Sequence, residues 1–511
     1  MDTLNNLNDS ILGFTGFVGS HIRENLNPDT TEYFNSQNFK EVKGRSFNRV
    51  YCTCVPAIKW WANKNPNEDL ETIEEIKETL KTIKCNKFFL ISTIDVHDHS
   101  VPGQYEDNVI PSPEPYGKHR YELEQYLRSF LGDKLFILRL PALFGNGLKK
   151  NYIFDLMNDN NVEDINMNSS LQWYSMTWLW EDILTCEEFS QEVVNLYSEP
   201  IETSDIVKVL FENYDHMVVS TNSKRISYNH SSIFGIKTMN EVMDSLMEYI
   251  ELEKYKKQDN KLVISNMAWE HRHDEHAAFL MQRHGINKLE ILPTKFGPWE
   301  HVFNTNLEKQ LSMFEKYGVE VYSVQSVLYR IDGSFGDECV EDHLKKVVKL
   351  CENIGAKVIV MGTPKKRVSC KKSDICSTLG NVQESTQVKI CLEPNSKEYG
   401  CQIGTNLDEC KEIKGSSKFH LNYDTGNALM EKDRLPELSD DISHIQISRS
   451  FLQPLRKNDY TNMSICGITE SIRLLRNSGE NVHVSLETVV KPHLLSEQMR
   501  RFTTFMCFNN M

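Results

Sequence analysis

The chain lacks several features that would restrict what it can be. No stretch approaches the roughly 18 consecutive apolar residues that a membrane-spanning helix needs. The first ten residues, MDTLNNLNDS, have neither the basic nor the apolar segment of a secretory signal peptide. Glycine and proline are sparse, with 24 and 16 residues among 511, which excludes collagen-like and linker-dominated chains. We therefore expect a cytoplasmic globular protein that does not enter a membrane.

Positive charge is also in deficit. The chain has 57 Lys and Arg against 72 Asp and Glu, and its net charge of -15 argues against a nucleic-acid-binding protein. The 13 cysteines form no repeating framework, so we expect reduced thiols rather than disulfides. Because 511 residues exceed what one core usually organises, more than one domain is expected. These features favour small-molecule partners and leave a homo-oligomeric state open.

A polar, lysine-rich segment divides the chain. Residues 251–260 read ELEKYKKQDN and separate two halves that have different sequence patterns. The expected organisation is an N-terminal domain over residues 1–250, a linker over 251–260 and a C-terminal domain over 261–511.

The first half opens with a glycine-rich turn. A short apolar strand, residues 10–12, leads into Gly13-Phe14-Thr15-Gly16-Phe17-Val18-Gly19, where a helix is expected to begin. Glycines at such a junction let backbone amides approach a pyrophosphate at the helix N-terminus. The candidate cofactor-binding residues are therefore Gly13, Gly16, Phe17, Val18 and Gly19. Taken alone, the pattern also suits a tight turn in any α/β fold.

Three further residues extend this pattern. Thr93 lies at the end of a predicted strand, and Tyr116 precedes Arg120 by one helical turn. Together with the glycines, they resemble the extended short-chain dehydrogenase/reductase family, whose motifs are G-x-x-G-x-x-G, a strand-end Ser or Thr, and Y-x-x-x-K. The resemblance implies a Rossmann-type doubly wound parallel sheet, a nicotinamide cofactor, and catalytic roles for Thr93, Tyr116 and Arg120, the last replacing the family's lysine. The expected ribose-binding acid is absent from residues 35–37, so NAD and NADP both remain open.

The second half repeats a strand-then-helix unit. Most candidate strands start about 30 residues apart, the length of a βα unit, and eight units in about 250 residues predict a (β/α)8 TIM barrel. Residues 365–387 show no clear amphipathic helix, so that unit is expected to be shortened. The eight strands are expected to begin at Lys261, Lys288, Val319, Ala356, Val388, Lys418, Ile442 and Asn481.

Each of the last four strands alternates aliphatic with polar residues. The aliphatic face is expected to meet the helices, which places Glu393, Asp424, His444 and Glu487 toward the lumen in one register. Three carboxylates and one imidazole suit one divalent metal, Mn²⁺, Mg²⁺, Co²⁺ or Zn²⁺. Two of them, Glu393 and Glu487, are the candidate catalytic acid and base. A metal there would stabilise the enediolate that forms when a proton next to a sugar carbonyl is removed.

The second half resembles the xylose isomerase-like sugar phosphate isomerase/epimerase superfamily. The stretches SNMAWE, SVQSVLY, VMGTPKKR and LEPNSKEYG add to the four polar strand residues. The resemblance implies that Glu393, Asp424, His444 and Glu487 are metal ligands and that the two glutamates act as acid and base. Two positions depart from the ketose 3-epimerases, whose substrate-binding His and second Glu are Asn427 and Tyr399 here. The substrate is therefore not expected to be a simple free ketose.

The two halves together indicate a bifunctional carbohydrate enzyme. We expect a nicotinamide-dependent epimerase, dehydratase or reductase of nucleotide sugars joined to a metal-dependent isomerase or epimerase. Its expected substrates are a sugar, a sugar phosphate or a nucleotide sugar. Two alternatives stay open: a non-catalytic regulator that senses a dinucleotide or a sugar, and a DNA-repair barrel like endonuclease IV.

Overall fold

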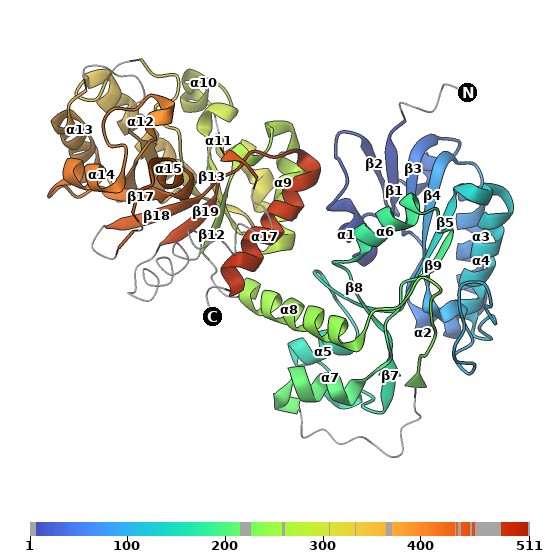
Figure 1. Cartoon of the computed structure of the whole chain (residues 1–511). Coiled ribbons are helices and arrows are strands. Elements are labelled where there is room, and N and C mark those ends of the chain that lie inside the picture. The colour runs from blue at the N-terminus through green and yellow to red at the C-terminus, as the bar shows by residue number, and fades with distance from the viewer. Residues whose placement is uncertain are drawn as a thin grey trace. The chain divides into compact units, whose positions relative to one another are not determined.

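Two compact units make up the chain, and each is described by itself. The computed structural model describes residues 7–214, 226–257, 261–305, 307–332, 334–363, 370–434, 436–437, 441–449, 452–454 and 482–508. The first unit comprises Met1–Glu253 and the second Lys254–Met511 (Figure 1). Residues 251–257, predicted to be linker, are the end of helix α8 (Met239–Lys257), and residues 258–260 lie outside the described residues.

A six-stranded parallel sheet forms the centre of the first unit. Its strand order is β2-β1-β3-β4-β5-β9, so the order reverses between β1 and β3. The carboxyl ends of the strands at such a reversal are where sheets of this type bind ligands. The sheet confirms the predicted Rossmann-type doubly wound fold. The strands are β1 (Asp9–Leu12), β2 (Thr31–Phe34), β3 (Ser46–Cys52), β4 (Lys84–Thr93), β5 (Leu135–Leu140) and β9 (Val193–Asn195).

Helices cover both faces of this sheet (Figure 1). On one face, Ile73 of α3 and Leu127 of α4 pack in a cluster with strand residues such as Val50. On the other face, Ile22 of α1 and Ile183 of α6 pack in a separate cluster. The sheet is therefore buried on both sides, as its apolar strands require. The helices are α1 (Phe17–Arg23), α2 (Lys59–Lys64), α3 (Pro66–Leu80), α4 (Pro115–Leu131) and α6 (Leu179–Glu188).

A smaller part of the first unit forms two further sheets. One has the order β10-β7-β11, and the other pairs β6 with β8. Their elements are β6 (Ala142–Phe144), α5 (Tyr152–Asn158), β7 (Ser169–Leu171), β8 (Trp173–Ser175), β10 (Ile201–Glu202), α7 (Thr203–Leu210) and β11 (Ile226–Ser227).

The second unit is a closed barrel of eight parallel strands. Neighbours pair in chain order from β12 to β19, and β19 pairs with β12 to close the barrel, which confirms the predicted (β/α)8 architecture. The strands are β12 (Leu262–Ser265), β13 (Lys288–Ile291), β14 (Glu320–Val324), β15 (Val358–Gly362), β16 (Lys389–Glu393), β17 (His420–Asp424), β18 (Ile442–Ile447) and β19 (His483–Leu486).

One helix of the barrel corrects the sequence analysis. Residues 365–387 show no clear amphipathic pattern, which predicts a shortened unit, but α13 (Lys372–Glu384) occupies that segment and buries Ile375, Leu379 and Val382. These three residues follow the spacing of one helical face, which intervening polar residues and Gly380 obscured. The other helices are α9 (Asp274–His284), α10 (Trp299–Asn304), α11 (Leu307–Glu315), α12 (Glu338–Ile354), α14 (Leu407–Lys414), α15 (Thr425–Glu431) and α17 (Leu495–Phe508).

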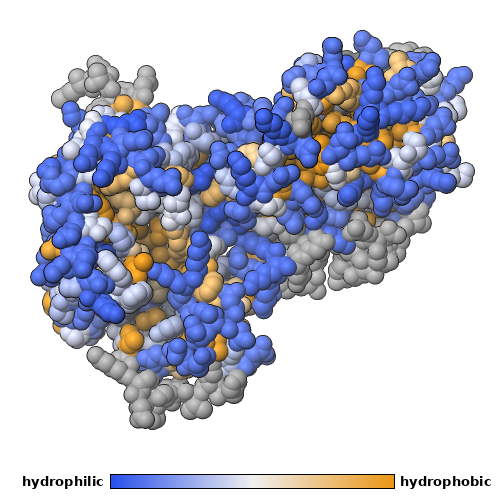
Figure 2. Space-filling view, turned by 180° about the vertical axis from the view of Figure 1, so that it is seen from behind, coloured by the Kyte–Doolittle hydropathy of each residue, from blue (hydrophilic) through white to orange (hydrophobic). Residues whose placement is uncertain are grey.

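The helices are amphipathic rather than apolar on all sides. Within the described residues, none is both long enough and apolar enough to cross a membrane. Hydrophilic residues cover most of the face shown in Figure 2. The apolar side chains are used instead for the sheet and barrel cores.

Candidate functional site

The glycine turn of the first unit is tightly packed. Gly13 follows β1 with φ +91, a backbone conformation that favours glycine. A Cβ on Gly13 would lie 2.8 Å from the carbonyl carbon of Thr53, and one on Gly19 would lie 2.1 Å from the Gly13 carbonyl oxygen. At Gly16 the nearest such atom is 3.3 Å away. The turn therefore needs glycine for its backbone shape and for the close approach of α1 to β1.

These glycine roles fit a dinucleotide-binding turn. Gly16 is the N-cap of α1, and Phe17 and Val18 are its first residues, after β1 where the strand order reverses. After β2, Asn35 and Asn38 form a turn in which the Asn38 side chain accepts the Asn35 N–H at 2.7 Å. This turn offers neutral amides to a ribose, so the choice between NAD and NADP stays open.

Tyr116 and Thr93 lie together at the carboxyl end of β4. Thr93 caps the short helix η2 (Ile94–Val96) by accepting the Asp95 N–H, and its side chain acts on the ionisation of Tyr116. Burial raises the pKa of Tyr116, as does the negative charge of Asp95, while Arg120, Thr93 and Lys59 act in the opposite direction. The sequence prediction thus named two neighbouring groups that can share a proton.

The family resemblance implies that Arg120 takes the place of a catalytic lysine, but in the structure its guanidinium is paired with a carboxylate. Its guanidinium binds both carboxylate oxygens of Asp69, one of them at 2.8 Å from Nη2, and Arg120 is 3% exposed. It also lies over the Tyr116 ring, 4.1 Å from the ring centroid. Arg120 is therefore part of a buried ion pair.

Several polar residues next to Thr93 were not predicted. Asp95 accepts hydrogen bonds from Lys59 at 2.5 Å and from Tyr228 at 3.3 Å, and His99 Nε2 lies 2.9 Å from it. His99 Nδ1 in turn lies 2.9 Å from His230 Nε2. Asp95 could have been suspected because it follows Thr93 by two residues. The others come from distant segments, so sequence spacing carries no signal for them.

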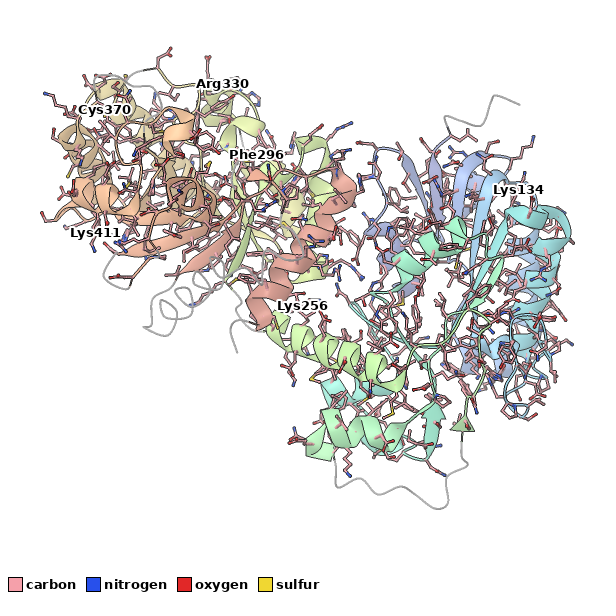
Figure 3. All side chains as sticks on the ribbon, viewed as in Figure 1. Lys134, Lys256, Phe296, Arg330, Cys370 and Lys411 are labelled. Carbon is pink, nitrogen blue, oxygen red and sulfur yellow. The ribbon has the colours of Figure 1, made fainter. Side chains whose placement is uncertain are left out.

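The barrel contains a cavity of about 530 Å³ at the carboxyl ends of its strands. Glu393 ends β16, Asp424 ends β17, and Glu487 follows β19, so three strands bring one carboxyl group each to this cavity. Arg330, labelled in Figure 3, and Arg449 also line it. This volume lies within the usual range for small-ligand sites.

Two of the three carboxyl groups, those of Glu393 and Asp424, are held by specific hydrogen bonds. The Asn427 amide donates to Glu393 Oε1 at 2.7 Å, and the Asn427 backbone N–H donates to Asp424 Oδ1 at 2.6 Å. The Ser448 hydroxyl donates to Asp424 Oδ2 at 2.8 Å. Burial raises the pKa of Asp424 to about 6, and burial together with the charges of Asp424 and Glu393 raises the pKa of Glu487 well above its ordinary value. The negative charges of these carboxyl groups therefore repel one another in the cavity, which opposes ionisation of all three.

His444 does not line this cavity. On β18 it lies opposite Asn422 of β17, whereas Asp424 lies opposite Gln446, so His444 is one layer deeper in the lumen. The alternation of the strands predicts one register for all four residues, whereas the structure places His444 at a different level from Asp424. A register shift between Leu421 and Asn422 contributes to the difference.

In the deeper layer, His444 belongs to a network centred on Glu290. His444 Nε2 lies 3.0 Å from Glu290, which is fully buried. Burial opposes ionisation, but the hydrogen bonds and charge of His444, with other donors, lower the pKa of Glu290, so this residue is an anion. The other donors to its carboxylate are Gln446 at 3.0 Å, Gln325 at 3.2 Å, Ser323 at 2.8 Å and Ser485 at 3.0 Å.

The donor set of the cavity suits a hard divalent cation. Within the described residues, no three His, Cys, Asp or Glu side chains are positioned to hold a metal ion. Even so, Glu393, Asp424 and Glu487 line one cavity, and oxygen ligands of this kind match Mg²⁺ or Mn²⁺. A cation between them would remove the repulsion that raises the pKa of Glu487.

Three solved structures are similar to about half of the chain each. An NAD-dependent NDP-hexosamine 5,6-dehydratase, TunA, of tunicamycin biosynthesis shows 14% identity over 50% of this chain and 99% of its own, with TM-score 0.38. A dTDP-4-dehydrorhamnose reductase from Clostridium acetobutylicum shows 16% identity over 48% and 100%, with TM-score 0.38. A D-allulose 3-epimerase from Methylomonas sp. shows 12% identity over 47% and 93%, with TM-score 0.36.

One family model is similar to part of the second unit. No curated protein matches the chain. Residues 279–504 match the model of the xylose isomerase-like TIM barrel family, as the sequence analysis predicted for the second half of the chain.

Proposed function

We propose that the chain is a bifunctional carbohydrate enzyme. In this proposal the barrel is a metal-dependent isomerase or epimerase of a sugar or sugar phosphate, and the first unit is a nicotinamide-dependent enzyme that modifies a nucleotide sugar. The observation that carries the proposal is the group of three carboxyl groups, two of them buried and that of Glu393 half-buried, in one cavity at the carboxyl ends of the barrel strands. The family match of residues 279–504 supports it.

Each residue of the barrel site has a proposed task. Glu393, Asp424 and Glu487 would hold the cation, which when bound supplies stabilisation of negative charge on the substrate oxygens. Glu393 and Glu487 belong to strands separated by two others, so they face the cavity from different directions. One removes the proton next to the carbonyl, and the other returns a proton to the neighbouring carbon or the opposite face. Asn427 orients Glu393, and Ser448 orients Asp424, through the hydrogen bonds described above.

In the first unit, Tyr116 is the proposed acid/base. Its hydroxyl would exchange a proton with a sugar hydroxyl or ketone, and a bound nicotinamide supplies hydride transfer. Thr93, which acts on the ionisation of Tyr116, is proposed to position the Tyr116 hydroxyl. Gly13, Gly16 and Gly19 form the turn that would receive the dinucleotide.

Isotope exchange tests the barrel assignment. The full chain, loaded with Mn²⁺, is incubated with keto sugars and their phosphates in tritiated water, and incorporation next to the carbonyl is measured. We expect incorporation by the wild type and its loss in Glu487→Gln, because the acid/base pair is then broken. A matched control is Glu412→Gln, which changes an exposed glutamate of α14. Equal incorporation in wild type and Glu487→Gln would contradict the proposal.

Metal content separates the barrel reaction from its alternative. We expect about one divalent ion per chain, lost in a Glu393→Gln, Glu487→Gln double variant. Three zinc ions per chain, with cleavage of abasic-site DNA, would instead favour an endonuclease like endonuclease IV.

A further inference from the structure

Thr53 lies between the two ends of the glycine turn. It is the first residue after β3. A Cβ on Gly13 would lie 2.8 Å from the Thr53 carbonyl carbon, and a Cβ on Gly19 would lie 2.7 Å from the Thr53 hydroxyl oxygen. Both glycines therefore leave room for the same residue, so Thr53 limits where the turn and the start of α1 can lie.

Hydrogen bonds join Thr53 to the beginning of the turn. Its backbone N–H donates to the Leu12 carbonyl oxygen at 2.8 Å, which continues the pairing of β3 with β1 by one residue. Its hydroxyl lies 2.8 Å from the same Leu12 oxygen and 3.1 Å from the Gly13 carbonyl oxygen. A hydroxyl has one hydrogen, so these two carbonyl oxygens share it. The side chain of Thr53 thus holds the peptide at which the turn begins.

The Thr53 contact differs in kind from the other hydrogen bonds of Gly13. The Gly13 N–H donates to the Phe34 carbonyl oxygen at 2.7 Å, and the Gly13 carbonyl oxygen accepts the Gly16 N–H at 3.0 Å. Both of these bonds join backbone groups, whereas Thr53 contributes a side-chain donor. A substitution of Thr53 can therefore loosen the Gly13 carbonyl without changing any residue of the turn. Because a peptide is planar, this also loosens the direction of the Phe14 N–H.

We infer that Thr53 is a positioning residue for the dinucleotide, because its hydroxyl holds the glycine turn in the shape that receives the pyrophosphate. This inference rests on the proposed nicotinamide dependence of the first unit. Thr53 acts through the turn, so its effect is expected mainly on ligands that contain the pyrophosphate.

Nucleotide binding by the full-length chain tests the role of the hydroxyl. Thr53→Val replaces it by a methyl group, which cannot donate and cannot approach a carbonyl oxygen to 2.8 Å, and Thr53→Ala removes it without crowding. We expect both variants to bind NADH or NADPH about two- to tenfold more weakly in a fluorescence titration, the usual range for the loss of one hydrogen bond. Thr53→Ser keeps the hydroxyl and should restore binding.

Two comparisons separate a positioning role from a general weakening of the fold. ADP-ribose contains the pyrophosphate and should lose affinity by the same factor as NADH, whereas AMP lacks it and should lose less. Both affinities are measured by calorimetry. Thr72→Val makes the same chemical change in α3, where the Thr72 hydroxyl donates to the Glu68 carbonyl oxygen at 2.9 Å. This control should leave all of the affinities unchanged.

The outcomes distinguish the inference from the proposed function. Unchanged NADH and NADPH affinity in Thr53→Ala, an equal loss in Thr72→Val, or an equal loss for AMP and ADP-ribose would overturn the role of Thr53. A wild-type chain that binds neither NADH nor NADPH would instead overturn the proposed function of the first unit. Weaker binding in Thr53→Val and Thr53→Ala that Thr53→Ser restores supports both.

Discussion

The raised pKa of Asp424 makes a quantitative prediction about stability. In the folded barrel this pKa is about 6, against 3.8 for an exposed aspartate, because the carboxyl group is buried. A difference of about two pH units corresponds to about 3 kcal/mol. Between these two values the folded state keeps a proton that the unfolded state has lost, so the free energy of unfolding falls as pH rises from about 4 to about 6. Above pH 6 the barrel remains destabilised by about 3 kcal/mol from this group alone.

The variant Asp424→Asn removes this titration while keeping the shape. Its amide oxygen can still accept the Asn427 N–H, and its amide nitrogen can donate to the Ser448 hydroxyl. In chelator-treated full-length protein we expect Asp424→Asn and wild type to differ little near pH 4. At pH 7 the variant should be more stable by about 3 kcal/mol. Denaturant unfolding of the barrel, followed at several pH values, measures the difference.

A matched control and a cation complete this experiment. Asp408→Asn changes an exposed aspartate of the same unit, paired with Arg434, and should give no pH-dependent difference from wild type. Mn²⁺ at about 100 times its dissociation constant should stabilise the wild type by about 2.7 kcal/mol and have a much smaller effect on Asp424→Asn. Parallel stability curves for wild type and Asp424→Asn between pH 4 and pH 7 would refute the reasoning.

Three further changes test the supporting structure. Gly19→Ala places a Cβ 2.1 Å from the Gly13 carbonyl oxygen, so the turn must shift. We expect NADH or NADPH binding, measured by fluorescence titration, to weaken at least about tenfold. Gly16→Ala, whose nearest contact is 3.3 Å, should weaken binding less. Arg120→Met leaves buried Asp69 without its bidentate partner and should destabilise the first unit by about 3 kcal/mol or more in denaturant unfolding. Glu290→Leu takes the buried acceptor from five donor side chains and should cost the barrel about 3 to 5 kcal/mol, with Glu290→Gln costing less. Equal stability of Glu290→Leu and wild type would contradict the role of this network.

The strand pattern of the barrel was predictable because its physical signal is strong. Each strand alternates or runs apolar over several residues, and the predicted starts at Lys288 and Ile442 coincide with the first residues of β13 and β18. The helix α13 was missed because only Ile375, Leu379 and Val382 mark its buried face. The glycine turn was predictable because backbone shape restricts its positions to glycine.

The contacts of Lys59 show what the sequence could not supply. Its partners Asp95 and Tyr228 are 36 and 169 positions away. Such contacts depend on how the sheet and the smaller part of the first unit pack together, which no local pattern encodes. Arg120 could be placed near Tyr116 from helical spacing, but its partner Asp69 lies on another helix.

The polar faces of the late barrel strands therefore have two physical explanations. Alternation identifies which residues face the lumen, but it does not separate residues two positions apart, because both point the same way. Asp424 and Glu487 reach the cavity, whereas His444 lies below them and is hydrogen-bonded to Glu290. An anion at the barrel centre is tolerated only when donors surround it, so Glu290 requires polar partners on β14, β18 and β19. The deeper polar layer follows from that electrostatic demand, and the outer carboxyl groups have no comparable structural need, which is why they carry the functional proposal.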